Sequence, residues 1–309
     1  MRCPILSQLP APPRDKSGWP WGEESPQLPD VMPSGHPWPK ISIVTPSYNQ
    51  ERFVEETIRS VLLQGYPNLE YIIMDGGSTD GSVEIIKKYE KWLTYWVSEP
   101  DRGQSEAINK GFKKASGEIY TWLNSDDYLL EKALRNIALA YHTSPEAGGW
   151  FGGCLQVNAG GNTLLTRWPN RLDVEGLAEW SENGVVQPAC FLSEKAWHNC
   201  GPLDEDLYYG MDFDLFLKIA KRFHIEKVND VLAAAVVHED AKTQIDTGQM
   251  YAIQYLIQIR HGYERFAIKE ISQWINEYVE LRKKLNRISR FPLVRPIMPI
   301  ARIVWRKFL

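Results

Sequence analysis

The sequence predicts an α/β fold with a Rossmann-like, mostly parallel central sheet flanked by helices, followed by a C-terminal helical tail. Two observations support this prediction. Between residues 40 and 142, a short apolar run, a polar loop and a helical pattern follow one another four times. Acidic residues follow closely after two of the apolar runs. Repeated units of this kind form parallel sheets, and ligands bind where the carboxyl ends of the strands meet.

The composition limits the class of protein. The chain has 309 residues, of which 43% are hydrophobic and 24% charged, and these are ordinary values for a globular protein. Its net charge of −4 gives no reason to expect a nucleic acid partner. No apolar run reaches the ~18 residues of a membrane span. The four cysteines lack metal-ligand spacing and follow no signal peptide, so we expect reduced thiols and a cytoplasmic location.

Three segments differ in composition. Residues 1–39 are rich in proline and show no periodicity, so we expect an extension that is disordered or lies along the domain surface. Residues 40–243 carry the strand and helix patterns of one domain. Residues 244–309 form the tail, which is helical by pattern from Gln249 to about Ile288.

The first half of the domain is expected to contain four strands, at 41–44, 69–74, 95–97 and 119–123, with a helix at 105–115 after the third. Asp75 follows the second strand, and Asp126 and Asp127 follow the fourth. Adjacent carboxylates at a sheet edge can hold a divalent cation together with a phosphate. On their own they can equally form a solvated turn before a helix at 130–142, with Asp127 near its cap.

The second half reads as a mixed sheet that would hold a second substrate. We expect a helix from Ser193 and strands at 150–157, 162–168, 187–192, 226–228 and 232–237, of which the first two form a hairpin. Another helix, at 211–222, carries Asp212 and Asp214 in its first turn. By helical spacing Asp214 is expected at the surface.

Six short motifs occur in one order between residues 41 and 243. They are ISIVTPSYN (41–49), IIMDGGSTDGS (72–82), DRGQSEAINKG (101–111), WLNSDD (122–127), MDFDL (211–215) and VVHEDAKT (236–243). With these motifs the chain resembles the family 2 glycosyltransferases, which are inverting enzymes of the GT-A fold. The resemblance implies a nucleotide-binding half at 40–128 and an acceptor half at 129–243.

The resemblance also implies roles for single residues. Thr45, Pro46 and Tyr48 would line the base and ribose of a nucleotide-sugar, and Asp75 would contact a pyrimidine. Arg102 and Gln104 would also bind the donor, although Arg102 can instead pair with Asp101. Many members have two acids where this chain has Asp75 and Gly76, which bears on the nucleotide identity.

The remaining roles concern the reaction itself. Asp126 and Asp127 would meet the ribose and the metal-bound diphosphate, with Asp127 and His238 as the metal residues and Mn²⁺ or Mg²⁺ as the cofactor. Asp212 would be the general base, although a helix-start acid can also be only a cap. The acid usually found just before the base is Met211 here. His238 can also be a hydrogen-bonded histidine at a strand end.

The function implied by the resemblance is the inverting transfer of a sugar from a nucleotide-sugar, with a UDP-sugar as the expected donor. The expected acceptor is a hydroxyl of a saccharide or of a lipid-linked molecule, and the expected role is in surface polysaccharide or glycolipid synthesis. Two alternatives stay open. A non-catalytic nucleotide-sugar binder of the same fold would have no need of Asp212. A nucleotidyltransferase would be expected to carry a Gly-rich, basic phosphate loop after the first strand, and TPSYNQER (45–52) offers none. No G-x-G-x-x-G follows a strand, which disfavours a NAD-dependent oxidoreductase.

The tail combines basic and apolar residues. Residues 281–309 contain nine basic residues and no acid, interleaved with apolar side chains. This composition suits residues 291–309 for peripheral contact with an anionic membrane surface. Alternatively, the apolar residues pack onto the domain or onto a second subunit in a homodimer.

Overall fold

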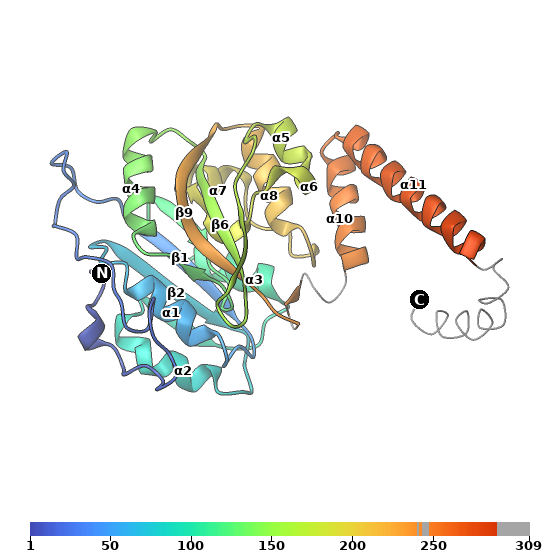
Figure 1. Ribbon diagram of the computed structural model, residues 1–309. Helices are drawn as coiled ribbons and strands as arrows, with labels where there is room; N and C mark the ends of the chain where they lie inside the picture. The colour runs from blue at the N-terminus through green and yellow to red at the C-terminus, as the bar shows by residue number, and fades with distance from the viewer. Residues whose placement is uncertain (240, 243–246, 289–309) are drawn as a thin grey trace. The chain divides into compact units, whose positions relative to one another are not determined.

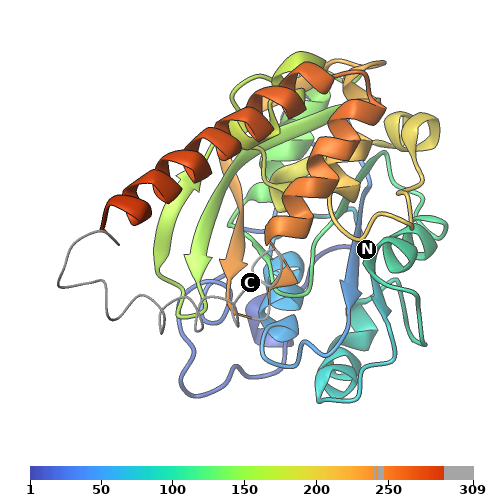
Figure 2. The ribbon, with the colours of Figure 1, turned by 90° about the vertical axis from the view of Figure 1, so that its right-hand side faces the viewer.

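The structure is a computed structural model that describes residues 1–239, 241–242 and 247–288. It divides into two compact units, one spanning Met1–Ile257 and the other beginning at Gln258. In the first unit a single sheet runs in the order β3-β2-β1-β4-β8-β6-β9-β5, with β7 paired to β6. The sheet curls through the middle of this unit (Figures 1 and 2). The predicted α/β fold with a mostly parallel sheet is confirmed.

The parallel half of the sheet contains β1 (Ile41–Ser47), β2 (Leu69–Asp75), β3 (Tyr95–Ser98) and β4 (Ile119–Trp122). All four predicted strands are present. The end predicted for the first strand, at residue 44, is wrong, because residues 45–47, expected in the loop that follows, continue the ladder opposite 73–75 of β2. This extension carries both strand ends to the same edge of the sheet.

Helices cover both faces of the parallel half. Side chains of α1 (Val54–Leu62) join one core cluster with the inward residues of β1. On the other face α3 (Gln104–Phe112) approaches so closely that a Cβ on Gly111 would lie 2.5 Å from Val44 Cγ1. Glycine permits this close contact. Two more helices complete the half, α2 (Ser82–Tyr89) and α4 (Ala133–Thr143).

The second half is mixed, as predicted. The expected hairpin is β6 (Gly149–Asn158) with β7 (Thr163–Arg167), and β8 (Cys190–Ser193) runs antiparallel to β4. The strand expected at 187–192 is wrong at its start, where Pro188 lies in a 3₁₀ turn, Gln187–Ala189. A two-residue strand that the sequence did not indicate, β5 (Tyr128–Leu129), pairs with β9.

The two strands expected at 226–228 and 232–237 are a single strand, β9 (Ile225–Val237). Asn229 and Asp230 have the composition of a turn. The chain nevertheless stays extended there, because its register with β6 shifts near Gly153 and absorbs the irregularity. The strand therefore runs unbroken to Val237, and His238 follows it directly.

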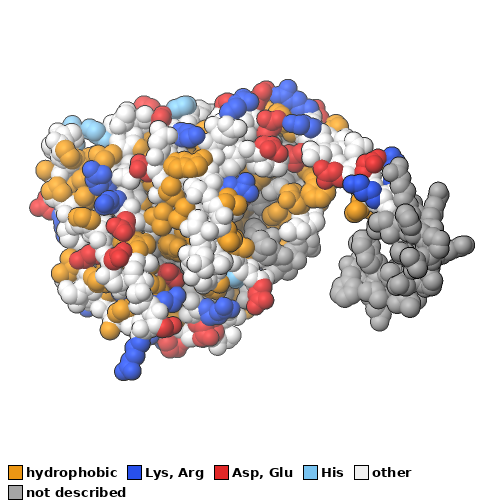
Figure 3. Space-filling view, in the orientation of Figure 1, with side chains coloured by type: hydrophobic (Ala, Val, Ile, Leu, Met, Phe, Trp, Pro, Cys, Tyr) orange, Lys and Arg blue, Asp and Glu red, His pale blue; other side chains and the backbone are white. Residues whose placement is uncertain are grey.

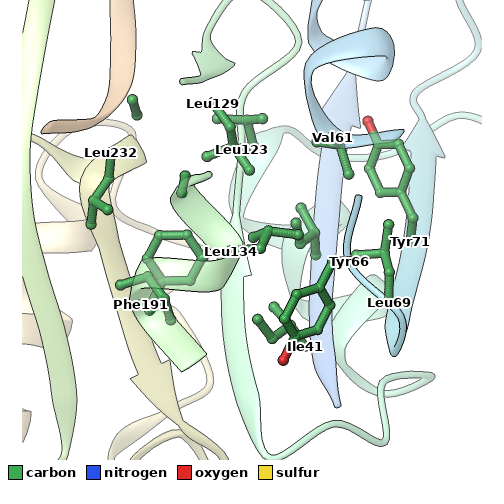
Figure 4. Close-up of a cluster of buried hydrophobic side chains, with 14 of the residues drawn as sticks. Ile41, Val61, Tyr66, Leu69, Tyr71, Leu123, Leu129, Leu134, Phe191 and Leu232 are labelled. Atoms are coloured by element: carbon green, nitrogen blue, oxygen red, sulfur yellow. The ribbon is translucent and has the colours of Figure 1, made fainter. Parts of the chain in front are cut away.

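The helices of this half are α5 (Val174–Ala178), α6 (Trp180–Asn183), α7 (Glu194–Cys200) and α8 (Met211–Ala220). Ser193 caps α7, as its hydroxyl accepts from the Ala196 amide at 3.1 Å. The core between the sheet and the helices includes side chains from both halves, among them Ile41, Leu123, Leu134 and Phe191 (Figure 4).

The N-terminal extension lies along the domain, one of the two alternatives expected. Cys3, Leu9 and Trp38 are buried in the core cluster. The fully buried guanidinium of Arg59 donates to backbone carbonyls of residues 10, 20 and 21 and to the Tyr89 hydroxyl. Because buried donors need partners, Arg59 holds the extension to α1.

The tail is helical, as predicted, but it is not one helix. α10 (Thr247–Arg260) ends before Gly262, whose φ of +83° breaks the helix, and α11 (Glu264–Ile288) begins after it. The segment expected at a membrane or a subunit interface, 291–309, lies outside the described residues. No described helix is both long and apolar enough to span a membrane. On the face shown in Figure 3, described charges of both signs are interspersed.

Candidate active site

A cavity of about 540 Å³ opens at the carboxyl ends of the strands. It falls within the usual size of small-molecule sites, roughly 300–1,000 Å³. Its walls come from the loop after β4, the last residues of β9, the start of α8 and the start of α3, and all of them belong to the first unit. The lining includes four of the residues predicted from the sequence, namely Gln104, Asp126, Asp127 and Asp212.

Asp127 is held in a fixed, buried position. Its carboxylate accepts from the backbone amide of Val236 and from the side-chain amide of Asn124, each at 3.1 Å. Its own carbonyl accepts from the Thr57 hydroxyl at 2.7 Å. Burial and the neighbouring Asp126 carboxylate raise the pKa of Asp127 well above its usual value. A cation at this position would relieve both causes.

Asp126 contacts the end of β9. Its Oδ2 lies 3.1 Å from His238 Nε2, and the His238 ring packs on the Phe53 ring with 4.5 Å between centroids. The imidazole is almost fully buried, and its Nδ1 has no hydrogen-bond partner among the described residues. Through Nε2, His238 positions Asp126. Its predicted role as a metal residue stays a prediction.

The pair of acids fits a divalent cation of one particular kind. Within the described residues, no three acidic, histidine or cysteine side chains gather to hold a metal by themselves. Mg²⁺ is usually bound by one or two carboxylates together with substrate phosphates. Asp126 and Asp127 supply such carboxylates, and burial together with the Asp126 charge raises the pKa of Asp127, which a bound cation would oppose.

Asp212 stands at the start of α8, on another wall of the cavity. The helix is capped by Gly210, so the alternative of Asp212 as the N-cap is wrong. Burial raises the pKa of Asp212, while backbone amides of the first turn and Lys242 oppose the rise. A carboxylate whose pKa is raised is a better proton acceptor near neutral pH.

Lys242 is a cavity residue to which sequence reasoning gave no role. Its Nζ lies 4.0 Å from the centroid of the Tyr208 ring and donates to Gln104 Oε1 at 3.3 Å. Gln104 Nε2 donates to Asn124 Oδ1 at 2.6 Å, and Asn124 in turn donates to Asp127. Burial lowers the pKa of Lys242 to about 8. Its place at the end of the sixth motif was the only signal in the sequence.

The residues predicted around the nucleotide base do not line this cavity. Thr45 is buried and shares a hydrogen bond with the Tyr71 hydroxyl at 3.1 Å, and Pro46 is buried beside it in β1. Tyr48 is 60% exposed just beyond β1. These three residues occupy the strand end next to β2, and their contact with a nucleotide stays a prediction.

Asp75 stabilises the turn that follows β2. Its carboxylate accepts from the amides of Gly77 and Ser78 and from the hydroxyls of Ser78 and Ser98. Four hydrogen bonds to one carboxylate fix the turn after β2. Any contact between Asp75 and a pyrimidine would be made in addition to these bonds.

Arg102 lies in an exposed position and pairs with Glu205 and Glu106, rather than with Asp101 as the alternative had it. It does not line the cavity. The surface position expected for Asp214 is wrong. That residue is 1% exposed, and its Oδ2 lies 2.7 Å from Lys218 Nζ one turn along α8.

Comparison with known proteins relates a large part of the chain to one family. Residues 42–193 match the family model described as Glycosyl transferase family 2. An uncharacterized glycosyltransferase of Haemophilus influenzae is 40% identical over 111 residues, which cover 34% of this chain and 44% of the relative. The putative teichuronic acid biosynthesis glycosyltransferase TuaG of Bacillus subtilis is 40% identical over 92 residues, covering 29% and 36%. The chain thus matches less than half the length of these curated relatives.

Solved structures show the same fold. TarS 1-349 of S. aureus, in complex with UDP-GlcNAc, superposes with a TM-score of 0.58 at 17% identity, covering 83% of this chain and 78% of that chain. The mannosyltransferase PcManGT from Pyrobaculum calidifontis, in complex with GDP-Man and Mn²⁺, gives 0.53 at 16% identity, covering 91% and 86%. At these identities the likeness establishes the GT-A fold alone. Together with the family model, it shows a glycosyl transferase family 2 domain over residues 42–193 of the chain.

Proposed function

We propose that this chain transfers a sugar from a nucleotide-diphosphate sugar to an acceptor hydroxyl, inverting the anomeric centre, and that a UDP-sugar is the donor. The observation that carries the proposal is the meeting of Asp126, Asp127 and Asp212 at one cavity. The first two suit a diphosphate with its cation, and the third suits proton transfer. A non-catalytic binder needs only the first two.

The donor would lie with its diphosphate against the loop after β4. Asp127 is fixed by Val236 and Asn124, so its carboxylate would keep one position as the donor enters. Mn²⁺ or Mg²⁺, when bound there, would neutralise the diphosphate charge that grows as the sugar leaves. The complexes of TarS with UDP-GlcNAc and of PcManGT with GDP-Man and Mn²⁺ support this arrangement.

Asp212 would act as the general base. The acceptor oxygen forms a bond to the anomeric carbon while its proton passes to the Asp212 carboxylate. The bond from the anomeric carbon to the diphosphate oxygen breaks, and the nucleoside diphosphate leaves with the electron pair. A single displacement on the face opposite the leaving group inverts the configuration. A positioned base of this kind contributes about 10²–10⁴-fold.

Lys242 would add positive charge beside the same centre. It lines the cavity, and its hydrogen-bond chain through Gln104 ends at Asp127. The Lys242 ammonium would interact with a departing diphosphate more strongly in this partly enclosed site than in open water, because the effective dielectric constant is lower there. Gln104 would hold the Lys242 ammonium in place, and in this way it would contribute to donor binding, the role predicted for it from the sequence.

The acceptor would lie against the aromatic residues of the cavity, Trp180, Tyr208 and Tyr251. Aromatic faces suit sugar rings, so a saccharide or a lipid-linked saccharide is the expected acceptor. The name of the Bacillus subtilis relative supports a role in surface polysaccharide or glycolipid synthesis. Peripheral contact of residues 291–309 with the cytoplasmic membrane face would fit a lipid-linked acceptor and a cytoplasmic enzyme.

The test is the release of nucleoside diphosphate from a panel of UDP- and GDP-sugars, with Mn²⁺ or Mg²⁺ and with excess chelator. We expect release from at least one donor, dependent on the cation. Full release in excess chelator would remove the metal from the proposal. Binding of a donor without release, in the presence of candidate acceptors, would favour the non-catalytic alternative.

A further inference from the structure

Two hydrogen-bonding atoms at the cavity have no partner among the described residues. They are the indole nitrogen of Trp122, which can only donate, and Oε1 of Gln187, which can only accept. Trp122 is 1% exposed and Gln187 is 8% exposed, and both line the cavity. A buried polar atom without a partner costs about 1–3 kcal/mol. Such atoms in a functional cavity point to a ligand that satisfies them.

Neither side chain is free to turn toward another partner. Gln187 Nε2 donates to the backbone carbonyl of Trp122 at 2.7 Å, which directs Oε1 away from that bond. The Trp122 indole is held between the Phe112 and Phe216 rings, at 6.5 and 6.3 Å between centroids. The two side chains are therefore held in place, and linked through the Trp122 carbonyl, before any ligand arrives.

The chemistry of the pair selects its ligand. A hydroxyl group can both accept and donate a hydrogen bond, so the hydroxyls of one sugar ring can satisfy Trp122 Nε1 and Gln187 Oε1. A phosphate oxygen carries no proton to donate to Gln187. Because Trp122 ends β4, the strand that leads to Asp126 and Asp127, the pair lies next to the expected diphosphate position. The sugar ring attached to that diphosphate is the nearest source of hydroxyls.

We propose that Trp122 and Gln187 form a hydroxyl-binding subsite that selects the transferred sugar of the donor. The proposal rests on the proposed function, because it assumes that a nucleotide-sugar occupies the cavity. It adds the residues that distinguish one sugar from another. A site built to hydrogen-bond a hydroxyl discriminates strongly against a sugar that lacks it, since its own polar atoms are then left unpaired.

The first variant is Trp122→Phe, which keeps an aromatic ring between Phe112 and Phe216 but removes the N–H. Its matched control is Trp150→Phe. Trp150 is also fully buried and its indole nitrogen also lacks a partner among the described residues, but it does not line the cavity. The second variant, Gln187→Met, removes the acceptor with little change of volume, and it keeps the test decisive if Trp122→Phe does not fold.

The measurements are the affinities for UDP and for UDP-glucose, UDP-galactose and UDP-GlcNAc in Mn²⁺, and the release of UDP from each donor and its monodeoxy analogues. For the preferred donor we expect both variants to lose about tenfold to a hundredfold in kcat/KM, the effect of one lost hydrogen bond. The affinity for UDP itself should stay within about twofold. One monodeoxy donor should be as poor with wild type as the full donor is with the variants.

Three results would overturn the subsite. Equal losses of affinity for UDP and UDP-sugar would place the two atoms at the nucleotide. Unchanged discrimination among donors, with a loss only in transfer to an acceptor, would place them at the acceptor. Similar losses in Trp150→Phe would make the effect one of general packing.

Failure of the proposed function has a different signature. If wild type releases UDP from no donor but binds a UDP-sugar more tightly than UDP, the transfer reaction is wrong. The subsite then stands if Trp122→Phe abolishes that difference in affinity, and it falls if the difference persists.

Discussion

Asp126 and His238 share a hydrogen bond of 3.1 Å, although 112 positions of the chain separate them. The neighbouring Asp127 is bonded in the same way to the backbone of Val236. The loop that ends β4 is thus fixed to the end of β9 at both of its acids. This arrangement places two carboxylates side by side in a buried wall, at an electrostatic cost that a cation and a diphosphate would offset.

His238→Phe tests the link between the two strand ends. The phenyl ring keeps the packing on Phe53 but leaves Asp126 without its partner. We expect a higher Mn²⁺ concentration for half-maximal activity, about tenfold or more, as when a group that orients a metal ligand is removed. The control is His224→Phe, because His224 is exposed and has a carboxylate partner at the same 3.1 Å. An unchanged Mn²⁺ dependence in His238→Phe would show that this bond does not prepare the site.

Asp127→Asn should change how stability depends on pH. The raised pKa of Asp127 means that the folded state holds this proton more tightly than the unfolded chain. Wild type without metal therefore loses stability as pH rises from about 4 through the raised pKa. The variant lacks this loss, so its deficit in Tm at pH 4 should shrink or reverse by pH 8. The measurement is thermal unfolding in chelator across this range, and a constant difference would contradict the burial of a carboxylate.

Lys242 should set an alkaline limit on activity. Burial lowers its pKa to about 8, so the ammonium loses its proton, and the site its positive charge, as pH rises past that value. We expect kcat/KM to fall above about pH 8. Lys242→Arg, whose guanidinium stays charged, should keep activity to higher pH, while Lys242→Met should be weak at every pH. Identical alkaline limits in wild type and Lys242→Arg would assign the titration to another group.

The tail prediction concerns residues beyond those the structure describes. If 291–309 form an electrostatic anchor, the full chain should sediment with vesicles of anionic lipid, and a chain ending at Arg290 should not. Binding should weaken as salt rises, because each basic residue near an anionic surface contributes about 1 kcal/mol that salt screens. Equal sedimentation of the two chains, or binding that ignores salt, would leave the alternative of packing onto the domain or a second subunit.

The sequence was sufficient to predict the parallel half of the fold. The buried strand β2 contains an apolar run, residues 71–74, that ends abruptly at an acid, and this pattern depends only on local residues. The loop acids Asp126 and Asp127 could be placed for the same reason. The predicted order of strands, loops and helices therefore located one wall of the cavity.

Contacts between distant segments were not predictable in the same way. Asp214 is buried with Lys218 as an oppositely charged partner one turn away, whereas spacing from the helix start indicated a surface position. The proline-rich extension has no periodicity, and it is ordered by Arg59 and the core. Lys242 is a common residue type at an uninformative position, and its role depends on Tyr208 and Gln104.

The central claim is that Asp212 takes the proton of an acceptor hydroxyl. The most direct measurement compares wild type and Asp212→Asn in transfer from the preferred nucleotide-sugar in Mn²⁺, together with the affinity for UDP. Asparagine is nearly isosteric but cannot accept the proton, so turnover should fall by about 10²–10⁴-fold while UDP binds as before. Asp206→Asn, at an exposed acid, is the control and should leave both unchanged. Transfer by Asp212→Asn at the wild-type rate would contradict the account.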